Sequence, residues 1–257
     1  MEQRKLLLSM MVVGMLSSAA LAISPMGPPV ATLAEGQYAV GLGYAYGEQT
    51  LEVSGITSGT GDAELDDLQN NMYYGCVGYG VSDVWSIGVA LGVADAEFDA
   101  DSGDDFDGDT EFGFAISTKR TLHDNGTDTK WGTVFQYCSL ASEDKISNTS
   151  SYANGHLSGI TAGKLELDWY EMQLAMGPAV QVNEDVSVYG GPFLHFVEAD
   201  LRHKAGGSVA EVELEQLFEL GGYIGVLMNL GGSAHLSAEF LITGEAWGFG
   251  IGAMFPM

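Results

Sequence analysis

The feature that most limits the fold of this chain is a two-residue alternation of large apolar side chains with small or polar ones. It is clearest over residues 213–230, which have the sequence ELEQLFELGGYIGVLMNL. One parity of this run is apolar and comprises Leu214, Phe218, Leu220, Ile224, Val226, Met228 and Leu230. The other parity is mostly polar or glycine and includes Glu213, Glu215, Glu219, Gly221, Tyr223, Gly225 and Asn229. Because successive side chains of a β-strand point to opposite faces, the run predicts a strand with one long apolar face.

The same alternation recurs from residue 36 to the end of the chain, in about ten runs altogether. The expected strands are 36–47, 72–81, 84–94, 111–119, 129–140, 169–182, 186–202, 213–230, 235–242 and 246–257. The run 186–202 is ambiguous in parity, and we expect Pro192 or a bulge to reset its register midway. Most runs reach the roughly 9 to 11 residues that a tilted strand needs to cross a bilayer.

The faces opposite the large residues indicate which solvent the apolar faces meet. They are largely Gly, Ala and Ser, and the chain contains 36 glycines. Such faces are too small and mild for a water-exposed surface, but they suit the crowded interior of a small barrel. The large aromatic residues near the ends of runs are typical of interfacial girdles, and they are Tyr38, Tyr73, Trp85, Trp131 and Trp247. We therefore expect an all-β fold, a closed antiparallel up-and-down transmembrane β-barrel of about ten strands. Strand numbers of roughly 8 to 12 agree with the pattern.

The start of the chain is typical of an export signal. Arg4 and Lys5 precede an apolar stretch, and the small residues Ala20-Leu21-Ala22 end it. The pattern predicts a signal peptide over residues 1–22 that is cleaved after Ala22, with an uncleaved anchor as the alternative. Residues 23–35 are then expected to form a proline-containing periplasmic leader, and residues 36–257 the barrel.

The connections between the runs alternate in length, as expected of an exported barrel. Long connections are expected near 52–69, 97–110, 142–164 and 203–210, and short turns near 82–83, 123–128, 183–185 and 231–233. Outer-membrane barrels have short periplasmic turns and long outer loops, so the order agrees with an N-terminus on the periplasmic side. Only the final outer connection, residues 243–245, is shorter than this pattern predicts.

The net charge argues against one class of partner, and the positions of the cysteines predict free thiols. The formal net charge is −26 at pH 7, with 9 Lys and Arg against 35 Asp and Glu. That balance argues against a nucleic-acid partner, because phosphate binding needs clustered cations. Cys76 and Cys138 are the only cysteines. They fall in non-adjacent expected strands, so we expect two free thiols that face inward.

The signal sequence, the leader before GQYAVGLGYAYG and the terminal AWGFGIGAMF together resemble those of small Gram-negative outer-membrane β-barrel proteins. The resemblance covers nearly the whole chain. It implies location in the outer membrane of a Gram-negative-type bacterium, contact with outer-membrane lipid, and recognition by the barrel-assembly machinery. Members of the family usually end on an aromatic residue, whereas here Phe255 is followed by Pro256 and Met257. The resemblance does not predict an oligomeric state.

One expected outer loop is densely acidic. Residues 95–111 read DAEFDADSGDDFDGDTE, and their candidate ligands are Asp99, Asp101, Asp105, Asp107 and Asp109, beside Asp104. Carboxylate oxygens at this density can share a hard cation such as Ca²⁺, although the spacing is not that of an EF-hand. The two hypotheses are weak Ca²⁺ binding and a solvated acidic loop. We expect no other cofactor.

Polar residues on the inward parity predict a network inside the barrel. Its expected members are Glu171, Glu219, Lys119, Lys130, His235 and Glu239. Two hydrolase hypotheses use some of the same region. His235, Ser237 and Glu239 are the residue types of a triad, but neighbours on one strand face are about 7 Å apart, too far for direct hydrogen bonds between short side chains. The other set, expected near the outer rim, resembles that of ten-stranded outer-membrane proteases and comprises His195, Glu198, Asp200 and His203.

The sequence therefore favours a non-enzymatic outer-membrane barrel. Within that class it leaves open a structural barrel and a narrow cation-favouring pore with acidic outer loops. The alternatives are a ten-stranded outer-membrane hydrolase and a soluble secreted cation-binding β-protein. No residue pattern decides between them.

Overall fold

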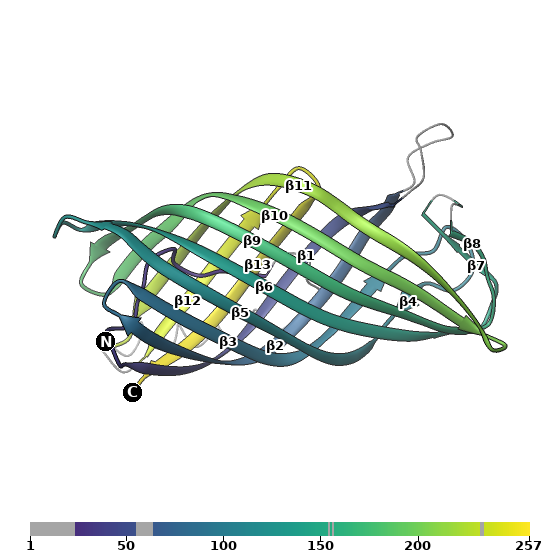
Figure 1. The fold of residues 1–257 in the computed structure, drawn as a ribbon, viewed down its shortest axis with the longest axis horizontal. Coiled ribbons are helices and arrows are strands. Elements are labelled where there is room, and N and C mark those ends of the chain that lie inside the picture. Colours follow the sequence, from purple (N-terminus) through teal and green to yellow (C-terminus); the bar gives the residue numbers. More distant parts are fainter. Residues whose placement is uncertain (1–23, 55–63, 154, 156, 232–233) are drawn as a thin grey trace, which may run out of the picture.

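The computed structural model describes residues 24–54, 64–153, 155, 157–231 and 234–257. The predicted signal peptide, residues 1–22, lies outside these residues. Within them the chain is all-β, and ten long strands are joined edge to edge into a closed ring (Figure 1). No helix of the described chain has the length and apolar character needed to cross a membrane.

All neighbouring strands of the ring are antiparallel. In ring order they are β1 (Tyr38–Val53), β2 (Glu64–Ser82), β3 (Trp85–Phe98), β5 (Asp109–Asp124), β6 (Thr129–Ile146), β9 (Gly163–Asn183), β10 (Val186–Ala205), β11 (Ser208–Asn229), β12 (His235–Ile242) and β13 (Ala246–Pro256). The ring closes because β1 pairs with β2 on one edge and with β13 on the other. The short strand β4 (Phe106–Asp107) pairs with β3, and β7 (Ser150–Tyr152) pairs with β8 (Leu157–Ile160) in a separate hairpin. The predicted closed antiparallel barrel of about ten strands is confirmed.

Short turns lie at one end of the barrel and longer connections at the other, as expected. The predicted bounds of three long connections need correction. The predicted long connection at 203–210 is wrong, because β10 and β11 are joined only by Gly206 and Gly207, with φ of +57° and +86°. Expected loops at 52–69 and 142–164 are also partly strand, since β1 reaches Val53, β2 starts at Glu64 and β6 reaches Ile146. These strand ends carry charged residues on their outer face and therefore lack the apolar signature used to identify strands.

Strand β11 changes parity partway along its length. His195 of β10 lies opposite Glu219, and Val197 lies opposite Gln216, so two steps on β10 match three on β11. This bulge sends Phe218, 70% exposed, outward and Leu214, fully buried, inward. The predicted shared apolar face of Leu214 and Phe218 is therefore wrong. The expected register reset within β10 is also wrong, because the extra residue lies on its neighbour.

The outer wall of the barrel divides into two zones. An apolar band lies towards the short turns, the lower end in this description, and a charged collar lies above it, towards the outer connections. Below the division, β9 and β11 expose large apolar residues such as Leu174, Ile224 and Phe218, and β10 between them turns the half-buried Leu194 and Phe196 to the same side. Above it, the same three strands point charged residues outward, and these are Lys164, Glu166, Asp168, Glu198, Asp200, Arg202, Lys204, Glu211, Glu213 and Glu215. An exposed apolar band bounded by polar residues is typical of a barrel surrounded by lipid.

The interior of the collar half is packed with apolar side chains. The core here includes Leu51, Val53, Leu65, Leu68, Phe98, Phe106, Leu140, Ile146, Tyr152, Leu165, Leu167, Trp169, Val197, Leu201 and Leu214. The ring narrows at this level because the β12–β13 hairpin ends below it and β1 pairs directly with β11, Val53 opposite Leu214. This explains why residues 243–245 form only a short connection.

The two zones of β11 predict responses of different size to the same substitution. Ile224→Arg places a charge in the apolar band, and we expect it to cost about 2 to 4 kcal/mol of folding free energy in lipid. Val209→Arg is the matched control, because Val209 is also exposed but lies at the outer hairpin. Urea unfolding in lipid vesicles measures both. Equal, small effects would show that the apolar band does not face lipid.

Candidate functional site

The lumen of the barrel is occupied by the leader. Residues 24–34 run inside the ring from Ser24, deep in the lumen, to the turn end near Asp83, where the Glu35 N–H donates to the Asp83 carboxylate at 3.2 Å. Met26, Val30 and Leu33 are buried. The expected periplasmic leader is thus part of the barrel interior over its described residues.

Two buried carboxylates bind the backbone of the leader. The Ser24 N–H and hydroxyl donate to the two carboxylate oxygens of Glu171 at 3.1 and 3.0 Å. The Met26 N–H donates to Glu239 Oε1 at 2.7 Å, and the Gln136 amide donates to the Ser24 carbonyl at 3.3 Å. Prolines at three leader positions carry no N–H, so the leader brings fewer donors that need a partner inside the barrel.

Glycines of the barrel wall make room for the leader. A Cβ on Gly250 would lie 2.2 Å from Pro25 Cγ, and one on Gly80 would lie 1.9 Å from the Ala34 carbonyl oxygen. A Cβ on Gly132 would lie 2.3 Å from the Pro29 carbonyl oxygen. No side chain larger than hydrogen fits at these three places without displacing the leader. The glycine-rich inner faces are the sequence signal that could have indicated an internal segment.

The structure brings four of the six predicted network residues into the lumen. Glu171 and Glu239 bind the leader, and Lys119 and His235 line the lumen cavity beside it. The other two lie elsewhere. Lys130 pairs with Asp124 at 2.8 Å at a short turn, and Glu219 accepts a hydrogen bond from Gln216 next to the β11 bulge.

A cavity of about 180 Å³ remains between the leader and the wall. Lys119, Cys76, Tyr74 and Glu239 contribute polar groups to a lining that is mainly apolar. Cys138 is free and buried and Cys76 is free and partly buried, and both face the lumen as the sequence predicts. The cavity is a small, partly open space beside the leader, and the leader remains the main occupant of this part of the lumen.

Around Glu171 lies a buried polar cluster that sequence reasoning only partly identified. His195 Nε2 lies 3.1 Å from Glu171 Oε1, and the Gln173 amide donates to the same oxygen. Glu171, Gln173 and His195 are all at least 97% buried. Ser24, Gln136, Gln173 and His195 complete a site that the strand alternation alone could not reveal, because the contacts depend on the docked leader.

Neither hydrolase set is assembled in this arrangement. The alternation of β10 turns His195 into the lumen and Glu198 and Asp200 to the outer wall. His195 is therefore deep inside and not at the outer rim, while His203 contacts the Thr161 carbonyl at 2.8 Å. On β12, the Ser237 hydroxyl donates to the Gly252 carbonyl, and Glu239 Oε1 is used by the leader.

The acidic outer loop is held by hydrogen bonds from the neighbouring outer connection that follows β6. Asp104 accepts hydrogen bonds from the Asn148 side-chain amide and from the Asn148 and Ser147 N–H groups, which lower the pKa of its carboxyl. The five candidate ligands are exposed, and they are Asp99, Asp101, Asp105, Asp107 and Asp109. Within the described residues, His, Cys, Asp and Glu side chains form no group of three arranged to hold a metal ion. Ca²⁺ binding by this loop stays a prediction.

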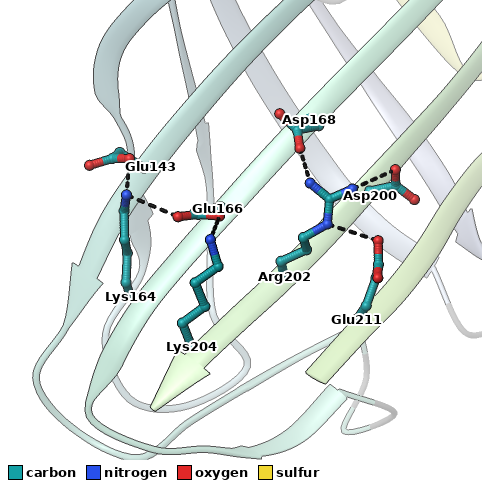
Figure 2. A network of polar contacts seen from close by, with 8 residues as sticks. All are labelled: Glu143, Lys164, Glu166, Asp168, Asp200, Arg202, Lys204 and Glu211. Carbon is teal, nitrogen blue, oxygen red and sulfur yellow. Dashed lines mark hydrogen bonds and ion pairs between the residues drawn. The ribbon is translucent and has the colours of Figure 1, made fainter. Parts of the chain in front are cut away.

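The charged collar contains two neighbouring ion-pair clusters on β6, β9, β10 and β11 (Figure 2). Lys164 pairs with Glu143 and Glu166, and Lys204 also pairs with Glu166. Arg202 binds Asp168, Asp200 and Glu211. Hydrogen bonds from Lys204 and then Lys164 lower the pKa of Glu166. These contacts offset part of the repulsion among the outward carboxylates.

Among known proteins, the chain shows similarity to solved structures alone. The chain matches no protein-family model and no curated protein. Among solved structures it is similar to the translocator domain of the autotransporter NalP from Neisseria meningitidis, with 10% identity, coverage of 99% of this chain and 95% of that one, and a TM-score of 0.44. It is also similar to Ail from Yersinia pestis, solved with a heparin analogue, with 13% identity, coverage of 87% and 99%, and a TM-score of 0.41. The outer-membrane protein OprG from Pseudomonas aeruginosa matches with 8% identity, coverage of 88% and 97%, and a TM-score of 0.40.

Adding a single methyl group at Gly250 tests whether the leader needs the space that this glycine leaves. In Gly250→Ala the three atoms nearest the new Cβ all belong to Pro25, so we expect the leader to be displaced at a cost of about 1 to 3 kcal/mol, the usual range for overpacking. Faster cleavage of the leader by added protease, with the barrel intact, would report the displacement. Gly222→Ala is the control, because no atom lies within 4 Å of its Cβ position.

The collar network predicts a pH dependence. Because the pKa of Glu166 is lowered in the folded state, its charge stabilises the fold above the unfolded pKa of about 4.3 and this contribution is lost as pH falls through the folded value. Glu166→Gln should therefore destabilise the barrel slightly at pH 7 and destabilise it less near pH 3. Urea unfolding at both pH values measures this. An equal loss at both would assign the effect to packing and not to charge.

Proposed function

We propose that this protein is a structural outer-membrane β-barrel that presents an acidic collar outside the bilayer and does not form an open pore. The observation that carries the proposal is that the chain's own residues fill the lumen at two levels. The leader fills the half surrounded by the apolar band, and the apolar core fills the collar half.

The placement in a membrane follows from the solvent that each surface requires. The closed ring satisfies backbone N–H and C=O groups within the wall, which is the condition for crossing hydrocarbon. The exposed large apolar residues include Leu42, Leu91, Leu174, Ile224 and Ile242, which lie on different sides of the ring. A soluble secreted protein would expose this band to water at high cost. The proposal also includes the predicted export signal and the location of the short turns on the periplasmic side of the membrane.

The narrow cation-favouring pore is the less favoured alternative. An ion path along the barrel axis would have to pass the leader and then the apolar core, where Leu214, Trp169 and Leu165 are fully buried. Carboxylates do face the lumen, but Glu171 and Glu239 are bound to leader backbone. A charge passing such an apolar core would lose its hydration without replacement.

Conductance in planar bilayers tests the proposal. We expect the intact protein to insert without steady current steps, with insertion checked independently by a boiling-dependent gel-mobility shift. A variant that lacks residues 24–34 is the control for the leader, and it should also be silent because the apolar core remains. Steady, cation-selective steps from the intact protein would overturn the closed-barrel proposal and favour the pore.

A further inference from the structure

The cavity beside the leader contains an ammonium group that no neighbouring side chain binds. Its volume is about 180 Å³, and Lys119 of β5 is part of its lining. The ammonium lies against the leader, because a Cβ on Gly27 would be only 2.6 Å from Lys119 Nζ. Within the part of the chain that the structure describes, Lys119 makes no hydrogen bond and no ion pair. An ammonium removed from bulk water needs acceptors for its three N–H groups.

A carboxylate lines the same cavity from the opposite wall of the barrel. It belongs to Glu239 of β12, which is 5% exposed and accepts the Met26 N–H at 2.7 Å through Oε1. Its Oε2 is buried without a hydrogen-bond partner. Lys119 and Glu239 attract each other across the cavity but do not form a direct ion pair. One group placed between them can therefore satisfy both.

The bridging group must accept a hydrogen bond from Lys119 and donate one to Glu239. A hydroxyl does both, whereas a carboxylate or a carbonyl only accepts and an ammonium only donates. An anion would also be repelled by Glu239, and a cation by Lys119. His235 Nδ1 and the Tyr189 hydroxyl have no hydrogen-bond partner, and both residues line the same cavity. The polar groups of the cavity thus fit a neutral hydroxyl compound.

The remainder of the cavity fits a small apolar group. Its apolar lining includes Met26, Met72, Ala90, Ala115 and Met254. An apolar cavity of about 150 Å³ holds one benzene molecule, so the space here is sufficient for one ring that carries a hydroxyl. The lining continues to Leu33 and Pro256 at the end of the barrel with the short turns, where a small molecule can enter.

We infer that this cavity is a binding site for a small neutral molecule with one hydroxyl on an apolar body, such as a phenol or an alcohol of similar size. The hydroxyl accepts a hydrogen bond from Lys119 and donates one to Glu239, and the apolar body lies against the methionines and alanines of the wall. This site goes beyond the structural role proposed above. Water alone is the alternative occupant, since a water molecule also accepts and donates.

Titration calorimetry on the intact barrel refolded in detergent tests the inference with phenol and benzene, which differ only by the hydroxyl. We expect phenol to bind about 10-fold more tightly than benzene, the lower end of the range for a hydrogen bond to a charged group. Lys119→Met keeps a side chain of similar length and removes the ammonium. It should abolish this ratio and leave the binding of benzene unchanged.

Two further variants locate the binding, and the boiling-dependent gel-mobility shift checks that each is folded. Ala90→Leu should prevent binding of both compounds, because the larger side chain takes up space in the cavity. Lys130→Met is the matched control, since Lys130 pairs with Asp124 outside this cavity, and it should keep the ratio. Equal affinities of the intact barrel for phenol and benzene, binding of neither, or a ratio that Lys119→Met leaves unchanged would overturn the inference.

Discussion

Closure of the strand ring is the constraint on which the rest of this structure depends. In hydrocarbon, no water can bind an exposed backbone N–H or C=O, so β1 must find a partner on each edge. It does so with β2 and β13, and above the short β12–β13 hairpin it pairs with β11. The hairpin can therefore be short without opening an edge. The narrower upper ring in turn is small enough for side chains to fill.

The leader and the glycines of the wall are two parts of one arrangement. Glycine weakens a strand because it has no side chain to pack and loses more entropy on folding. At Gly80, Gly132 and Gly250 the missing Cβ is the space in which leader backbone lies. Polar groups of the wall then bind that backbone through Glu171, Glu239 and Gln136. The half of the barrel inside the apolar band is in this way filled by a peptide together with inward aromatic side chains such as Tyr189, Phe193 and Tyr223.

The sequence alone predicts the closed barrel, the outward parity of residues such as Ile224 and Leu174, and the inward position of Glu171, Glu239 and Lys119. These follow from local alternation, which a single strand carries in its own residues. Local alternation cannot reveal the leader in the lumen, because those contacts join residues 147 positions apart, as between Ser24 and Glu171. It also cannot locate the β11 bulge. Leu214 and Phe218 have the same parity in the sequence, but the extra residue in the ladder between them turns their side chains to opposite faces.

That bulge has a consequence for how the barrel sits in a membrane. Below it, β11 turns its apolar parity towards lipid, and above it, β11 turns the apolar Leu214 to the interior and Glu213 to water. Strands β9 and β10 make the same change of solvent by a change of residue type with no change of parity. A slip of β11 by one residue would reverse both of its zones at once. The bulge therefore fixes the register of β11 relative to the level of the bilayer surface.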